Sequence, residues 1–181
     1  MFNKSLVLII GLLFIIGVGC SQSIPSKPSD FSFEYNWSEG TIPPPYHYEY
    51  TIKVEKDGSG TLMYRPDYSE NSKTPVWTEQ LPQISEAEMD LLYSRIAETG
   101  LLKKGTIERE NENVGGVSEW LEATMNGKKY EIKPGAEQTE KIKYLYERLH
   151  NIVPDFTWNK MEQQRQDYIK ANYKSFREEN P

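Results

Sequence analysis

The chain has 181 residues and a formal net charge of −6, with 27 acidic against 21 basic side chains. Nucleic-acid binding depends on basic patches that neutralise phosphates, so this balance argues against a nucleic-acid partner. Aromatic residues make up 12% of the chain. We expect these rings to build much of the hydrophobic core, because each buries a large apolar area.

An apolar run opens the chain. Lys4 supplies a basic start, and residues 6–19 are an uninterrupted series of aliphatic, Phe and Gly residues that ends at Cys20, the single cysteine. A secretory signal has an apolar region of about 7–15 residues after a positive start. A transmembrane helix needs about 20 apolar residues, so this run is short for one. The pattern therefore predicts that residues 1–19 are an export signal.

The end of this run, Gly17-Val18-Gly19-Cys20, resembles the lipobox of bacterial lipoproteins. That class usually has Leu or another branched aliphatic residue three positions before the cysteine, where this chain has Gly17. The resemblance implies cleavage before Cys20, a diacylglyceryl group on its thiol, and a domain held on a membrane of the bacterial cell envelope, outside the cytoplasm. Secretion after cleavage nearby, or an uncleaved short anchor, are the alternatives. An acylated Cys20 would leave no thiol for a disulfide, a metal site or a nucleophile.

Residues 20–30 follow as the lipidated cysteine and a tether. Ser21 to Asp30 is rich in Ser and Pro, a composition typical of extended linkers. We expect a globular domain over residues 31–154. Its first segment, residues 31–37, alternates aromatic with polar side chains, which predicts a half-buried strand.

Three more strands are predicted before the first helix. Residues 46–55 alternate apolar and polar side chains, and residues 61–65 form the return strand after the turn Asp57-Gly58-Ser59-Gly60. A calcium loop is the weaker interpretation of this turn, because most of the acidic ligands are missing. Residues 76–81, after Pro75, are expected to form a fourth strand.

The second half of the domain repeats strands and helices. Ser85 and Glu88 form a capping box that starts a helix, and Gly100 is a left-handed residue that ends it. The polar residues 105–116 are expected to be a loop. Asn126-Gly127 is a strong two-residue turn signal and predicts a hairpin of residues 118–125 and 128–133. Residues 137–151 should form a second helix.

This order of elements predicts an α+β fold, with an antiparallel sheet and helices packed on one face. Residues 155–181 follow as a C-terminal amphipathic helix, with apolar side chains at nearly helical spacing. This helix either docks on the domain or projects and binds the groove of a partner.

Motifs for catalysis, metal binding or cofactor binding are missing from the sequence. His47 and His150 are distant in the chain, and each is expected to be structural or exposed. Glu108, Glu110 and Glu112 favour a solvated loop over a weak cation site. We therefore expect no cofactor, no metal and no enzymatic activity; a hydrolase that uses a carboxylate pair is the alternative.

Aromatic side chains supply the functional hypothesis. Trp77 and Trp120 lie on predicted strands, and exposed aromatic residues on a sheet mark contacts with proteins or glycans. Trp120 lies on an open face if the helices cover the face of Leu121; otherwise it is covered. We expect a non-catalytic binding module of the cell envelope, with an envelope protein or a glycan as partner; a purely structural lipoprotein is a further alternative. The candidate interaction residues are Trp77, Trp120, Tyr168, Tyr173 and Phe176.

Overall fold

The computed structural model describes residues 25–43, 46–68, 73–108 and 116–173. The expected α+β class is confirmed, with a mostly antiparallel sheet and a C-terminal helix. The strands in the described part of the chain are β1 (Ser32–Ser38), β2 (Glu49–Val54), β3 (Gly60–Arg65), β4 (Trp77–Gln80), β5 (Thr106–Ile107), β6 (Ser118–Met125) and β7 (Lys128–Ile132). The helices are α1 (Glu86–Glu98), α2 (Leu101–Lys104), α3 (Glu140–His150) and α4 (Asp155–Asn172).

Strand β1 is the middle strand of the sheet, whose order is β4-β3-β2-β1-β6-β7-β5. It pairs antiparallel with β2 on one edge and with β6 on the other. Tyr35, for example, lies opposite Ile52 on β2 and opposite Leu121 on β6. The N-terminal strand therefore joins the two halves of the domain.

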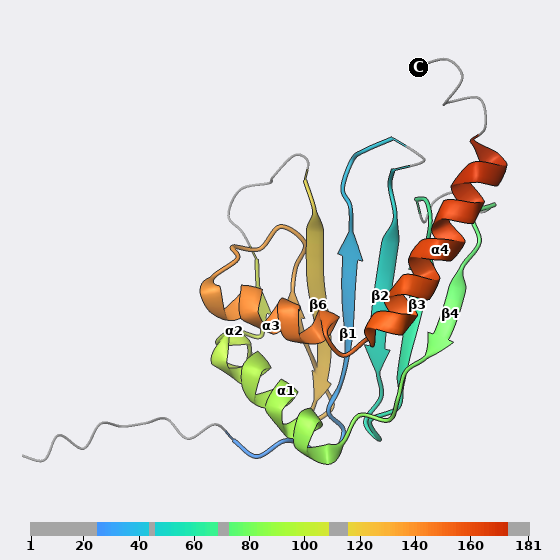
Figure 1. The fold of residues 1–181 in the computed structure, drawn as a ribbon. Helices are drawn as coiled ribbons and strands as arrows, with labels where there is room; N and C mark the ends of the chain where they lie inside the picture. Colours follow the sequence, from blue (N-terminus) through green and yellow to red (C-terminus); the bar gives the residue numbers. More distant parts are fainter. Residues whose placement is uncertain (1–24, 44–45, 69–72, 109–115, 174–181) are drawn as a thin grey trace, which may run out of the picture.

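The four helices of the described residues lie on one face of the sheet, with α1, α2 and α3 over the β6 side and α4 over β2, β3 and β4 (Figure 1). The apolar strand side chains point toward these helices, and the alternate, mainly polar side chains point the other way. This is the layered arrangement that buries one face of an antiparallel sheet. Core side chains that are almost fully buried include Phe33, Tyr35, Ile52, Leu62, Leu121 and Ile132 from the sheet, and Leu92, Ile96, Leu145 and Leu149 from the helices.

The predicted start and end of the first helix are present. The Ser85 hydroxyl accepts a hydrogen bond from the backbone N–H of Glu88, which satisfies one of the free donors of the first turn. Gly100 has φ 87° just after the helix, and the fully buried Leu101 follows it. In α3 the capping residue is Thr139, so the helix starts later than the expected residue 137.

The Asn126-Gly127 turn connects β6 and β7 as expected, with positive φ angles of 53° and 68°. Asp30 reaches this turn from the N-terminal segment. Its carboxylate accepts hydrogen bonds from the backbone N–H groups of Gly127 (2.6 Å) and Asn126 (2.8 Å), which lower the pKa of Asp30. The charged form of Asp30 therefore holds the N-terminal segment against the hairpin.

The tether segment also contacts the first helix. The Lys27 Nζ atom lies 2.7 Å from Glu86 Oε1 and 3.8 Å from Asp90 Oδ1, at the helix start. Residues 27–30 of the expected tether thus contact the domain, at the lower end of the sheet in Figure 1. Cys20 and the predicted signal lie outside the described residues.

The expectation that residues 105–116 form only a loop is wrong in one part. Residues Thr106 and Ile107 form the short strand β5, which pairs parallel to β7 at the edge of the sheet. Its Ile107 side chain is buried, and the backbone N–H of Lys133 donates to the Ile107 carbonyl at 2.9 Å. This pairing depends on a distant strand, so the local polar composition did not predict it. Residues 109–115, with Glu110 and Glu112, lie outside the described residues.

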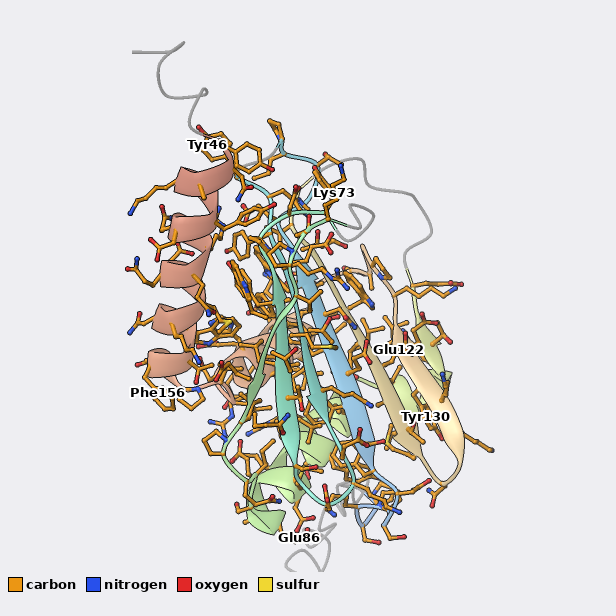
Figure 2. The ribbon with its side chains drawn as sticks, turned by 90° about the vertical axis from the view of Figure 1, so that its right-hand side faces the viewer. Tyr46, Lys73, Glu86, Glu122, Tyr130 and Phe156 are labelled. Carbon is orange, nitrogen blue, oxygen red and sulfur yellow. The ribbon has the colours of Figure 1, made fainter. Side chains whose placement is uncertain are left out.

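The C-terminal helix α4 docks along the sheet, as Figure 2 shows with the labelled Phe156 on its first turn. Its Met161 side chain is fully buried, and Lys160 forms an ion pair with Glu79 of β4. The Tyr173 hydroxyl donates to Asp67 Oδ2 at 3.1 Å. Of the helices in the described ranges, including α4, none is long and apolar enough to cross a membrane.

Replacing Gly58 with Ala should destabilise the domain by about 3 kcal/mol. Gly58 has φ +79°, and an added Cβ would lie 2.4 Å from the Ile84 carbonyl oxygen. Gly135→Ala is the matched control, because Gly135 has φ +75° with open space around the Cβ position; we expect a cost of about 1 kcal/mol. Urea unfolding followed by circular dichroism measures both. Equal losses of unfolding free energy in the two variants would contradict the steric argument.

Candidate ligand cleft

A cleft of about 360 Å³ lies between α3 and the helix-facing side of the sheet. Its back wall comes from β1, β2 and β6, and α3 supplies the opposite wall. Five aromatic side chains line it: Tyr35, Trp37, Tyr48, Tyr50 and Tyr146. A mainly apolar concave surface with a few convergent polar groups is typical of small-ligand sites.

The aromatic wall is a series of rings in contact across neighbouring strands. Trp37 is stacked on Tyr50, with ring centroids 5.2 Å apart and planes 7° apart. Its centroid lies 4.6 Å from that of Tyr48. Tyr48 is in turn stacked on Tyr64 of β3, and Tyr64 on Trp77 of β4. Because each ring is held by its neighbours, the wall is formed before any ligand arrives.

This series of rings ends at Trp37 on the β6 side. Both rings in contact with Trp37 belong to Tyr48 and Tyr50, at the start of β2. On the other flank, the residue paired with Trp37 is Glu119 of β6. An indole ring and a carboxylate therefore lie side by side on adjacent strands in the cleft.

Glu119 is held by two hydrogen bonds. The Tyr35 hydroxyl donates to its Oε1 atom at 2.7 Å, and the Gln138 side-chain amide donates to its Oε2 atom at 2.8 Å. An ionised carboxylate has about four acceptor sites, so further donors can still be accepted. Burial, Tyr50 and the Glu119 carboxylate raise the pKa of Tyr35 far above its usual range. The Tyr35 hydroxyl therefore stays protonated and keeps the Glu119 side chain in place.

Tyr146 of α3 contributes a hydroxyl that has no hydrogen-bond partner among the residues that the structure describes. The side chain is 3% exposed, and its ring lies 5.2 Å from that of Tyr35. Burial and the nearby Glu119 charge raise its pKa, so the hydroxyl remains a donor. A buried hydroxyl without a partner costs about 1–3 kcal/mol, and among the described residues Thr74 and Trp158 also have such an atom.

His150 lies at the junction of α3 and α4. Its ring is stacked on Trp158 of α4 with centroids 4.5 Å apart, and its Nδ1 atom lies 3.1 Å from the Tyr50 hydroxyl oxygen. Burial lowers the pKa of His150 below its usual 6.5, while Glu119 and Asp155 act in the opposite direction. The imidazole is therefore neutral at pH 7 and fits the expectation of a structural histidine.

Helix α4 fixes the far end of the aromatic wall. The Arg165 guanidinium lies over the Tyr48 ring, 4.6 Å from its centroid, and its Nη2 atom donates to the Tyr46 carbonyl at 3.0 Å. The cation and the ring attract each other electrostatically. The position of Tyr48 in the cleft thus depends on the docking of the C-terminal helix.

The predicted interaction residues do not form one surface. Trp77 lies on the helix-facing side, where its ring contacts Tyr168 of α4, and Tyr173 contacts Asp67. Trp120 is paired with Asn36 on the opposite, helix-free face. The structure thus separates Trp120 from Trp77, Tyr168 and Tyr173. Phe176 lies outside the described residues.

The second histidine, His47, is also away from the cleft. It is 1% exposed and stacked on Tyr68, with ring centroids 3.6 Å apart. Its Nδ1 atom lies 2.7 Å from the Gly40 carbonyl oxygen, and Nε2 lies 3.0 Å from Glu49 Oε1. His47 precedes β2, because the strand expected over residues 46–55 begins at Glu49.

The sequence did not single out the residues of the cleft. The strands that carry Tyr35, Trp37 and Tyr50 were predicted, and the structure buries Tyr35 and Tyr50 but leaves Trp37 partly exposed. Nothing local shows that Glu119 and Tyr146 converge on them. A usable signal was the polar Glu119 at a position whose neighbours on the same face, Leu121 and Ala123, are apolar.

Two carboxylates, Glu119 and Glu147, line the cleft, from β6 and α3. Within residues 25–173 as described, no group of three or more His, Cys, Asp or Glu side chains could hold a metal ion. The cleft is therefore equipped for hydrogen bonding and aromatic contact, and its carboxylates could also act as an acid and base pair.

Comparison with known proteins gives no assignment, since no protein-family model matches the chain and a search of curated proteins finds no significant match.

Lowering the pH below 6.5 should destabilise the folded protein through His150. Its pKa is lowered by folding, so the unfolded chain binds more protons than the folded chain just below pH 6.5. Stability is therefore fully present above that pH and falls as the pH drops below it. In His150→Gln this component should disappear, so the difference in unfolding free energy between the two proteins should shrink from pH 7 to pH 5. Urea titrations at each pH measure it. A difference in unfolding free energy that stays constant from pH 7 to pH 5 would contradict a lowered pKa for His150.

Proposed function

We propose that this protein is a lipid-anchored, non-catalytic binding module of the bacterial cell envelope that holds a small ligand in the aromatic cleft. The observation that carries the proposal is the cleft itself, an aromatic wall with Glu119 beside Trp37 and the unpartnered hydroxyl of Tyr146 nearby. Buried donors in native proteins almost always have a partner. A ligand that accepts from Tyr146 would supply it.

The arrangement of the domain supports the anchoring part of the proposal. Residues 27–30 lie at the end of the sheet where β1 begins, next to α1 and the β6–β7 turn. The cleft includes Trp37, near the other end of β1. Ser38 lies six positions along the strand from Ser32, a rise of about 20 Å. A lipid on Cys20 would thus hold the domain by one end, and the cleft lies toward the other.

A hydrolase is the second candidate, because Glu119 and Glu147 both line the cleft. Binding is favoured because both oxygens of Glu119 already accept hydrogen bonds from Tyr35 and Gln138, which suits a fixed acceptor. Chromatography of envelope glycans after incubation with the protein distinguishes the two. Products that form with wild type and not with Glu147→Gln would favour the hydrolase.

Trp37→Ala should abolish ligand stabilisation of the domain. A ligand that binds only the folded state raises the melting temperature, and the rise grows with the logarithm of the ligand concentration above its Kd. The probe is the small-molecule fraction of a bacterial envelope hydrolysate, added to residues 21–181. We expect the melting temperature to rise for wild type and for the control Trp120→Ala, whose ring lies on the other face of the sheet, but not for Trp37→Ala. An equal rise in all three would place the ligand elsewhere.

Replacing Cys20 with Ala should remove membrane attachment. In cells fed an alkyne fatty acid, wild type should carry the label and fractionate with membranes, because diacyl anchors give stable binding. Cys20→Ala should be unlabelled. Equal labelling of the two proteins would contradict the proposed lipidation of Cys20. It would not affect the proposal that the cleft binds a ligand.

A further inference from the structure

We infer that the ligand of the cleft is a neutral saccharide, bound with one ring against the indole of Trp37 and its hydroxyl groups between Glu119 and Tyr146. The inference rests on the proposed binding function and names its ligand class. It follows from three properties of the cleft: its charge, its aromatic surface and its mixture of donors and acceptors.

The charges of the cleft disfavour an anionic ligand. Glu119 and Glu147 are two acidic side chains in its lining. The basic side chain there, Lys143, lies 3.1 Å from Glu140 Oε1 and is partly neutralised by it. The imidazole of His150 is uncharged at pH 7, since burial lowers its pKa. A phosphate or carboxylate ligand would meet net negative charge in a partly desolvated site.

The aromatic surface suits a ring with apolar faces. A pyranose ring carries C–H groups on its faces and hydroxyl groups around its edge. The indole of Trp37, supported from behind by Tyr48 and Tyr50, offers a flat apolar surface whose orientation is already set. The carboxylate of Glu119 lies at the edge of that surface, on the adjacent strand. One saccharide ring can therefore contact the indole with its face and Glu119 with its edge.

The polar groups of the cleft include both donors and acceptors, which a polyhydroxylated ligand satisfies together. Tyr146 is a donor that lacks an acceptor, and Glu119 has acceptor sites left after the bonds from Tyr35 and Gln138. A hydroxyl group accepts from the first and donates to the second. A quaternary ammonium would gain from the rings and from Glu119 but has no acceptor for Tyr146. The saccharide accounts for both groups.

The volume limits the size of the bound part. The cleft measures about 360 Å³, at the lower end of the range of about 300–1,000 Å³ for ligand pockets. We therefore expect one or two sugar rings to be bound, with the rest of a longer glycan outside the cleft.

Titration calorimetry on residues 21–181 tests the ligand class. The probes are the neutral disaccharides cellobiose, maltose and N,N′-diacetylchitobiose, with tetramethylammonium as the organic cation and inorganic phosphate as the anion, each up to millimolar concentrations. We expect at least one disaccharide to bind and phosphate not to bind. Binding of tetramethylammonium with none of the disaccharides would overturn the saccharide inference while leaving a binding cleft. Binding of none of the probes would overturn it too, and the envelope-hydrolysate experiment would then decide the proposed function.

Two variants connect binding to the cleft. Trp37→Ala should weaken disaccharide binding at least tenfold, whereas Trp120→Ala, the matched loss of an indole from the helix-free face, should leave the affinity unchanged. The opposite pattern would place the saccharide on the helix-free face and overturn the inference.

Tyr146→Phe separates a binding role from a structural one. Removing an unpartnered hydroxyl should leave the melting temperature of the free protein unchanged or higher, while disaccharide affinity falls about tenfold. Tyr35→Phe is the control, because its hydroxyl donates to Glu119 in the free protein, so its loss should lower the melting temperature. If Tyr146→Phe destabilises the free protein and binds the disaccharide as wild type does, Tyr146 is structural and the inference fails.

Discussion

The pairing of β1 along both of its edges is the constraint on which the rest of the structure depends. Every buried backbone N–H and carbonyl group needs a partner. For β1 those partners lie on β2, the next strand in the chain, and on β6, more than 80 residues further along, as the pairing of Tyr35 with Leu121 shows. Neither half of the sheet is complete without the other, so we regard the described residues from Asp30 to Tyr173 as one cooperative unit.

The side chains of β1 also connect the sheet to the helices that cover it. Phe31, just before the strand, lies edge-on to Tyr93 of α1, with centroids 5.5 Å apart, and Tyr35 contacts Tyr146 of α3. The same alternation that buries one face of the strand places Trp37 next to Glu119. The cleft therefore has no separate scaffold, because its back wall is the middle of the sheet.

The cleft itself results from how the helices cover the sheet. Helix α3 is a helix of 11 residues that crosses the β6 side, and α4 leaves it at Pro154 in a different direction (Figure 1). The two helices diverge over a wide sheet and leave part of the aromatic surface uncovered between them. The rings stack on one another, which partly compensates for that exposure. The unpartnered Tyr146 hydroxyl lowers the stability of the free protein, and the proposed ligand binding would explain why it is there.

Sequence alone determined the local elements. Period-two alternation predicted the strands, Ser85 started the first helix, and Asn126-Gly127 formed its turn, because each signal acts within a few residues. The tertiary structure decided the central place of β1, the parallel pairing of β5, the docking of α4 and the meeting of Trp37, Glu119 and Tyr146. These features depend on contacts between residues far apart in the chain, whose free energy appears only when the whole sheet is paired, and no local pattern encodes it.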